Sequence, residues 1–370
     1  MFLALKEIKK EKLRFTMIIL VTALIAFLIY FLSSLAFGLA QLNKTAIEYW
    51  QADGIVLSEA ANQNIYASSI DEQVLIDAGI EVDQSINIGT ASITINDQDK
   101  DLIDVVFMGV QPQNEDLVAP IIEGNAVESD HQIVLSSNIR NEYDIEIGDI
   151  VTVSTTNRQF EVVGFTENSN YNTIPVGYVH RDMASQAMMI YSTDDPEADA
   201  VSTPTPNMPI RVAGVVIYGD VDQQVLEDNN LEFIEMNQFI NSIPGYMAQV
   251  LTFGLMIVAL AVISSIIIGI FMYILTLQKK PIFGILKIQG YRNMIITKSV
   301  IYQTFILISL GFLIGFGITL LTVYFIPSSV PVAISPTIFT IVTIFSILCS
   351  LIGSLFSVRT ILKIDPLDAI

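Results

Sequence analysis

Side chains that could bind a ligand stand at the ends of two long apolar runs of this chain. Glu48, Tyr49 and Trp50 follow the first run, and Tyr246 and Met247 begin the second. Aromatic rings and thioethers supply apolar surface, while carboxylate and phenol groups supply polar tips. In a dimer these residues could therefore line a cleft for a flat amphipathic molecule. An aromatic belt at a membrane surface has the same composition, and this alternative stays open.

Few other residues carry comparable chemistry. Tyr171 lies in the segment Asn170-Tyr171-Asn172, which we expect to be a loop facing the membrane. His131 and His180 are the only histidines, and isolated histidines are commonly surface or structural residues. The single cysteine, Cys349, excludes an intrachain disulfide. We therefore predict no catalytic residue and no metal site built by the chain itself.

The chain lacks the residues that would drive transport by itself. It contains no G-x-x-x-x-G-K-[ST] motif and no Gly-Lys pair, so it cannot bind a nucleotide in the P-loop manner. None of its apolar runs contains Asp, Glu, Lys, Arg or His, which argues against a proton- or sodium-driven carrier. We expect a subunit without enzymatic activity whose energy comes from another chain.

The elements that would position these residues are four apolar runs and one polar insert. Each run exceeds the ~20 residues needed to cross a bilayer, and the first is too long for the apolar core of a cleaved signal peptide. Residues 246–278 carry no charge over about 50 Å of helix, so this helix should extend beyond the membrane as a stalk. The predicted fold is an α-helical membrane protein with one span before, and three spans after, a mixed α/β extracellular domain. The predicted segments are transmembrane helices at 16–40, 246–277, 299–326 and 337–358, the extracellular domain at 41–245 and a short extracellular loop at 327–336.

The charge distribution orients these segments. The insert carries 6 basic and 34 acidic residues, whereas basic residues predominate at both chain ends and between the second and third spans. The positive-inside rule therefore places residues 1–15, 278–298 and 359–370 in the cytoplasm of a cell-membrane protein. Residues 1–15 would be an amphipathic helix on the membrane surface or a continuation of the first span. The acidic insert argues against a nucleic-acid partner.

Hydrophobic patterns predict short elements inside the insert. Asn157-Arg158 is a plausible two-residue hairpin turn. A proline-rich stretch at 192–209 is expected to be a loop. The predicted strands are 54–58, 86–95, 105–110, 133–136, 150–155, 160–165 and 210–218, and the predicted helices are 71–79 and 221–229.

The segment 279–291 is the most informative cytoplasmic stretch. Pro281 suits a helix start and Gly290 a helix end. Ile282, Ile285, Leu286 and Gln289 would share one face, which could insert into a groove on a cytoplasmic partner. The alternative is a linker helix lying at the membrane surface.

Small residues recur at four-residue spacing in three of the runs. The pattern includes Gly311 and Gly315, Ser34 and Gly38, and Ser346 with Ser350 and Ser354. Such spacing lets helices approach closely. It favours contacts within one subunit over a dimer face.

Two motifs make this chain similar to a known family. Residues 284–290, Gly-Ile-Leu-Lys-Ile-Gln-Gly, resemble the G-I-L-K-A-x-G element of FtsX/MacB-type (type VII) ABC permeases. The ending Asp365-Pro366-Leu367-Asp368-Ala369-Ile370 resembles their D-P-x-x-A-[LI] terminus, and the one-plus-three topology is also theirs. Within the family the chain looks most like the haem-exporting HrtB-type permeases of Gram-positive bacteria, over the stretches 5–8, 38–40, 273–279 and 283–290.

The resemblance implies a homodimer bound to two cytoplasmic ABC ATPase subunits. ATP-driven closure would move the stalks and expel haem, the implied substrate, by mechanotransmission. No intrinsic cofactor and no metal beyond haem iron are implied. The coupling helix to the ATPase would use Pro281, Ile282, Ile285, Leu286, Lys287 and Gly290, and the candidate haem-binding residues are Glu48, Tyr49, Tyr171, Tyr246 and Met247.

Two alternatives remain open from the sequence. One is a MacB-like exporter of peptide, antibiotic or lipid. The other is an FtsX-like transducer that passes motion to an external hydrolase without transporting anything, although the insert is larger than a docking module needs. The strongly acidic insert would repel haem propionates, which favours haem release over capture and is also an argument against haem.

Overall fold

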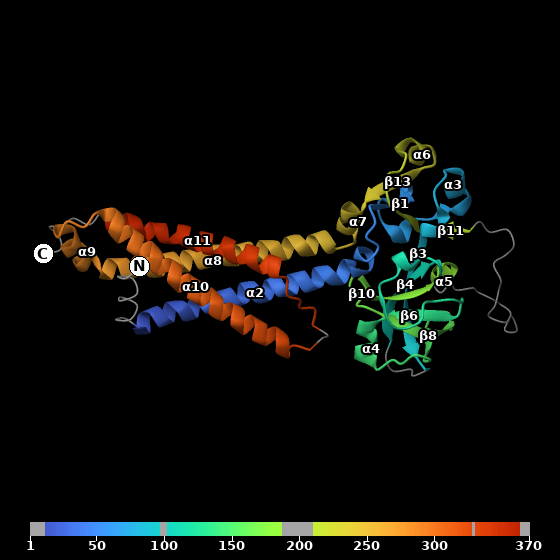
Figure 1. The fold of residues 1–370 in the computed structure, drawn as a ribbon, viewed down its shortest axis with the longest axis horizontal. Helices are drawn as coiled ribbons and strands as arrows, with labels where there is room; N and C mark the ends of the chain where they lie inside the picture. The colour runs from blue at the N-terminus through green and yellow to red at the C-terminus, as the bar shows by residue number, and fades with distance from the viewer. Residues whose placement is uncertain (1–11, 97–101, 187–209, 328–329, 363–370) are drawn as a thin grey trace. The chain divides into compact units, whose positions relative to one another are not determined.

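The computed structural model describes residues 12–96, 102–186, 210–327 and 330–362. The chain divides into two compact units (Figure 1). The helical unit comprises Met1–Leu39 and Ala248–Ile370, and the α/β unit comprises Ala40–Met247. The loop predicted at 192–209, most of the N-terminal amphipathic helix and the last eight residues of the tail lie outside the described residues.

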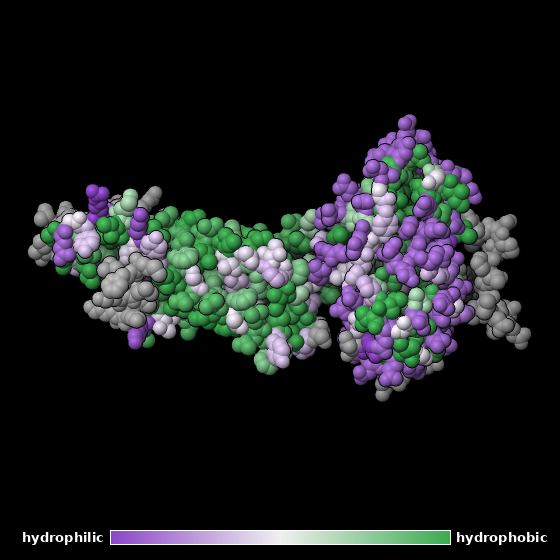
Figure 2. Space-filling model, viewed as in Figure 1, coloured by the Kyte–Doolittle hydropathy of each residue, from purple (hydrophilic) through white to green (hydrophobic). Residues whose placement is uncertain are grey.

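The helical unit contains the four predicted membrane helices, each long and apolar enough to cross a bilayer. Much of its visible surface is apolar, whereas that of the α/β unit is largely polar (Figure 2). The helix α2 runs unbroken from Lys12, so residues 12–15 continue the first span, which was one of the two alternatives for this segment. The bounds are α2 Lys12–Glu48, α8 Tyr246–Gln278, α9 Lys280–Ile288, α10 Asn293–Phe325 and α11 Pro336–Leu362.

Small residues bring these helices together within one chain. A Cβ added at Gly315 of α10 would lie 2.7 Å from the Cβ of Ala26 in α2. In the same way, a Cβ at Gly353 of α11 would meet the backbone of Ser265 in α8, and the Ser265 hydroxyl donates to the carbonyl of Cys349. These contacts agree with the expectation that the small residues serve packing inside one subunit.

We expect Gly315→Ala to destabilise the helical unit. The added methyl must push α2 and α10 apart, and overpacking of this kind costs about 1–3 kcal/mol. Gly317→Ala is the matched control, because nothing lies within 4 Å of a Cβ at Gly317 on the same helix. Thermal unfolding of the purified protein in detergent should show a lower midpoint for Gly315→Ala alone. Equal midpoints for the two variants would contradict this packing.

The α/β unit is built on one large mixed sheet. Its strand order is β13-β1-β12-β3-β4-β10-β6-β8-β5, with β7 paired to β3 and β8, β9 paired to β10, and β11 paired to β2 in a separate ribbon. The bounds are β1 Gly54–Ser58, β2 Ile70–Asp71, β3 Ser85–Ile95, β4 Ile103–Val110, β5 Ile121–Gly124, β6 Gln132–Ser136, β7 Ile150–Val153, β8 Gln159–Thr166, β9 Asn170–Tyr171, β10 Ile174–His180, β11 Arg211–Val212, β12 Gly214–Ile217, β13 Leu231–Glu235, α3 Glu72–Asp77, α4 Ser137–Tyr143, α5 Arg181–Gln186, α6 Gln223–Asp228 and α7 Met236–Ser242. The mixed α/β domain between the first two spans is therefore confirmed.

Two local predictions for this unit are wrong. The β7–β8 hairpin does not turn at Asn157-Arg158: Val153 pairs with Arg158, and the loop consists of the four residues 154–157. Asn157 has a positive φ and its N–H returns to the Val153 carbonyl, which closes the longer loop. The strand expected at 210–218 is split at Ala213, because the Ala213 N–H donates to the Asn87 side chain and to the Ile86 carbonyl.

Candidate functional site

The helix α9 follows α8 almost at once and has well-defined ends. Pro281 occupies its first turn, where the missing N–H costs nothing. Gly290 has φ +87°, and the next N–H, of Tyr291, returns to the Leu286 carbonyl as in a Schellman ending. The predicted start and end residues thus form both ends of a nine-residue helix.

The two faces of α9 differ in what they contact. Phe283 is buried in the core of the helical unit, and Leu286 packs against the same core. Ile282 and Ile285 are about half exposed, at 51% and 50%. The predicted face therefore needs a correction: Leu286 turns inward, and Ile288 joins the exposed apolar residues instead. Lys287 is half-buried at the edge between the two faces.

The second predicted group lies in the α/β unit, where the end of α2 is tied to a tight turn. The Asn172 N–H donates to the Asn43 carbonyl and the Thr173 N–H donates to the Leu42 carbonyl, each with an N···O distance of 3.0 Å. The Thr45 hydroxyl also accepts from the Asn170 N–H at 2.8 Å. We call these contacts the α2 anchor. Because β10 begins directly after the turn, the anchor joins the end of α2 to a strand inside the sheet.

The predicted ligand residues beside the anchor have their own partners. Glu48 is exposed and forms an ion pair with Lys44 at 2.5 Å. The Tyr49 hydroxyl donates to Glu167 at 3.0 Å. Partial burial, that hydrogen bond and the neighbouring carboxylates raise the pKa of Tyr49 to about 12, so its phenol is neutral at physiological pH. Trp50 is buried and donates its Nε1–H to the Leu117 carbonyl.

Tyr171 does not occupy the exposed loop expected for it. It is a residue of β9, is only 2% exposed and packs in the core of the α/β unit with its ring 5.8 Å from that of Tyr66. Burial raises the pKa of its phenol. The sequence signal failed here because the polar neighbours of Tyr171 form the α2 anchor while the ring points inward.

Two of the candidate ligand residues line different cavities. Tyr49 lines a cavity of about 670 Å³, and Glu48 lines another of about 790 Å³. Tyr246 packs against the core of the α/β unit, and Met247 is exposed. Among the residues the structure describes, no cluster of His, Cys, Asp and Glu could hold a metal ion. His180 lies 3.4 Å from Asp130.

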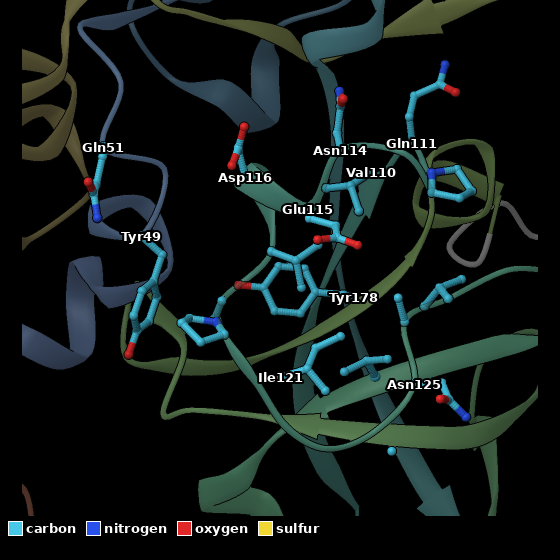
Figure 3. Close-up of a pocket in the computed structure, with 18 residues that line it drawn as sticks. Tyr49, Gln51, Val110, Gln111, Asn114, Glu115, Asp116, Ile121, Asn125 and Tyr178 are labelled. Carbon is cyan, nitrogen blue, oxygen red and sulfur yellow. The ribbon is translucent and has the colours of Figure 1, made fainter.

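The first of these cavities contains residues that the sequence did not single out (Figure 3). Its wall includes the connection between β4 and β6 and the buried ring of Tyr178, whose hydroxyl pairs with Ser169 at 2.7 Å. The polar run Gln111-Pro112-Gln113-Asn114-Glu115-Asp116 was the available signal, because it is rich in amides and contains no base. It resembles an ordinary loop until the fold places it around a cavity.

Comparison with known proteins finds one matching family and several relatives. Residues 254–366 match the family described as FtsX-like permease C-terminal. Over its whole length the chain is 26% identical to a protein from Staphylococcus haemolyticus that is named hemin transport system permease protein HrtB. The match covers 99% of that protein. The chain is 24% identical to a protein of the same name from Staphylococcus epidermidis, also covering 99%.

Two solved structures resemble part of the chain at low similarity. The periplasmic region of MacB from Actinobacillus actinomycetemcomitans is 11% identical, with a TM-score of 0.34 over 54% of this chain and 98% of that one. The extracellular domain of the ABC-type transporter YknZ from Gram-positive bacteria is 12% identical, with a TM-score of 0.30 over 51% of this chain and 92% of that one. The chain thus combines four candidate membrane helices and an inserted α/β domain with a C-terminal region of the FtsX-like permease type.

Proposed function

We propose that this permease exports haem from the membrane as a homodimer driven by two cytoplasmic ABC ATPase chains. The observation that carries the proposal is the full-length similarity to two permeases named for hemin transport. The orientation follows the charge distribution, with both chain ends inside and the acidic α/β unit outside.

The exposed face of α9 would receive the motion of the ATPase. Ile282, Ile285 and Ile288 present an apolar surface of the kind that a helix lays into a groove on its partner. The rest of α9 rests on the core of the helical unit through Phe283, so a force on α9 passes into the spans.

The force would reach the α/β unit through α2. This helix continues without a break from the helical unit to Glu48, where the α2 anchor fixes it to the turn before β10. A displacement of α2 along its axis therefore moves the strand that the anchor holds. Such a lever requires no channel for the substrate through the protein.

Haem would bind where the ends of α2 and α8 from two protomers meet. Tyr246 and Met247 offer a phenol and a thioether, and both groups are known haem-iron ligands. Glu48 carries a carboxylate at the corresponding end of α2 and is exposed. Tyr49 is held by Glu167 and would contribute ring surface rather than an iron ligand.

Haem titration of the purified full chain, read by the Soret absorbance, tests this proposal. We expect saturable binding that Tyr246→Ala weakens about tenfold or more, because loss of a ligand or a ring contact costs at least about 1.4 kcal/mol. Tyr273→Ala is the matched control, an exposed tyrosine further along α8. Absence of saturable binding, or equal binding by both variants, would overturn haem as the cargo at this site.

A further inference from the structure

The cavity lined by Tyr49 and Tyr178, here called the Tyr178 cavity, has a second kind of ligand chemistry. Its volume of about 670 Å³ is within the range of pockets that bind small molecules and short peptides. Valine and proline side chains form much of its wall, and carboxamides from Gln51, Gln111, Asn114 and Asn125 add hydrogen-bonding groups (Figure 3). The Asn114 amide is already bound to the Asp83 carbonyl.

The charge of the lining has one sign. Glu115 and Asp116 are its carboxylates, and no Lys, Arg or His lines it among the described residues. Tyr49 and Tyr178 both have pKa values raised to about 12, chiefly by burial, and so add no charge at neutral pH. The lining is therefore anionic, and it would repel the propionates of haem.

Three cations of the α/β unit form ion pairs with carboxylates outside the lining. Arg140 pairs with Glu123 and stacks on Phe165, and Arg181 pairs with Glu72 and Asp182. Lys44 pairs with Glu48. Since the lining has carboxylates and no cation of its own among the described residues, it favours a ligand that carries positive charge.

The cavity also adjoins an edge strand. β5 is the last strand of the sheet order, all four of its residues are exposed, and Ile121 and Gly124 line the cavity. Exposed edge strands are the sites to which extended peptides add by backbone hydrogen bonds. An extended peptide could thus lie along β5 and place basic and apolar side chains in the cavity.

We propose that the Tyr178 cavity binds a short cationic peptide bearing apolar side chains. The carboxylates of Glu115 and Asp116 select its charge, the carboxamides match its backbone, and the valine and proline wall takes its apolar side chains. The lining shares Tyr49 with the end of α2 but includes neither Glu48, Tyr246 nor Met247, and the proposal does not depend on haem being the cargo.

Trp50 reports on this cavity directly. It is the only tryptophan of the chain, and its Nε1–H donates to the carbonyl of Leu117, next to Asp116 in the cavity wall. A ligand that moves this wall alters the environment of Trp50. The same contact joins the cavity wall to Trp50, two residues beyond the end of α2.

The test is a fluorescence titration of the full chain in detergent. The probe is the capped peptide acetyl-Arg-Leu-Arg-Leu-amide, and acetyl-Glu-Leu-Glu-Leu-amide is its oppositely charged counterpart. We expect a saturable change in Trp50 fluorescence with the basic peptide alone. The double variant Glu115→Gln/Asp116→Asn should weaken it about tenfold, as two exposed ion pairs allow. Both side chains are exposed, and thermal unfolding verifies that the variant is folded.

Two controls test whether the peptide binds in the Tyr178 cavity. Glu59→Gln/Glu142→Gln removes the same charge from exposed positions outside the lining and should leave the titration unchanged. Equal losses of peptide affinity in both double variants would show that binding depends only on the net negative charge of the α/β unit. That result would overturn the Tyr178 cavity as the binding site. Tyr246→Ala should also leave the peptide titration unchanged. A loss confined to Tyr246→Ala would assign the peptide to the proposed haem site and overturn the Tyr178 cavity as the binding site.

Discussion

Ile285→Asp is expected to abolish stable association of this chain with the proposed ATPase subunit, and the proposed ATP-driven efflux with it. Ile285 lies in the middle of the exposed apolar face of α9, half exposed and with no role in the core. An unpaired carboxylate buried in an apolar groove costs about 3–5 kcal/mol, which is more than a hundredfold in affinity. Co-purification of the two chains from membranes, followed by haem efflux from cells, measures both losses.

Matched variants identify the surface responsible. Ile285→Leu keeps the apolar contact and should retain association. Met294→Asp places a carboxylate at another exposed position, in the first turn of α10, and should weaken association much less. Full association of the Ile285→Asp chain with the ATPase would rule out α9 as the coupling helix. Loss in both aspartate variants would instead extend the docking surface to the start of α10.

The sequence was sufficient to predict those elements whose sequence pattern has a single physical explanation. Uncharged runs longer than 20 residues have few uses besides spanning a membrane, and all four are long helices. The strand predicted at 86–95 lies within β3, and Pro281 and Gly290 mark the ends of α9. These elements follow from local chemistry alone.

Prediction failed where the local structure depends on contacts with residues distant in the sequence. The continuous apolar pattern at 210–218 is broken by Asn87, over 120 residues away, which binds the Ala213 N–H. Tyr171 has polar neighbours yet is buried, because those neighbours bind the end of α2. The Tyr178 cavity likewise combines the end of α2 with a loop more than 60 residues later, and no spacing rule connects them.

The α2 anchor depends on an unusual backbone. Asn172 and Thr173 have φ values of +50° and +69°, and in this conformation their consecutive N–H groups donate to the carbonyls of Asn43 and Leu42 in α2. A β-branched residue such as threonine is a rare occupant of this region. The side chain of Thr173 is exposed and contributes no packing that would explain it, so the position serves the two backbone hydrogen bonds.

Thr173→Pro is therefore expected to uncouple ATP hydrolysis from export. Proline cannot adopt this φ and has no N–H, so the bond to Leu42 is lost at a local cost of about 3 kcal/mol. We expect normal association with the ATPase, retained ATP hydrolysis and severely reduced haem efflux. Thr173→Gly keeps the N–H and relieves the strained φ, so it should keep efflux and raise the free energy of unfolding by about 0.5–1 kcal/mol. Normal efflux by Thr173→Pro would show that force reaches the α/β unit by another route. Equal loss of hydrolysis and efflux would instead indicate a general folding defect, because an uncoupled lever leaves the ATPase working.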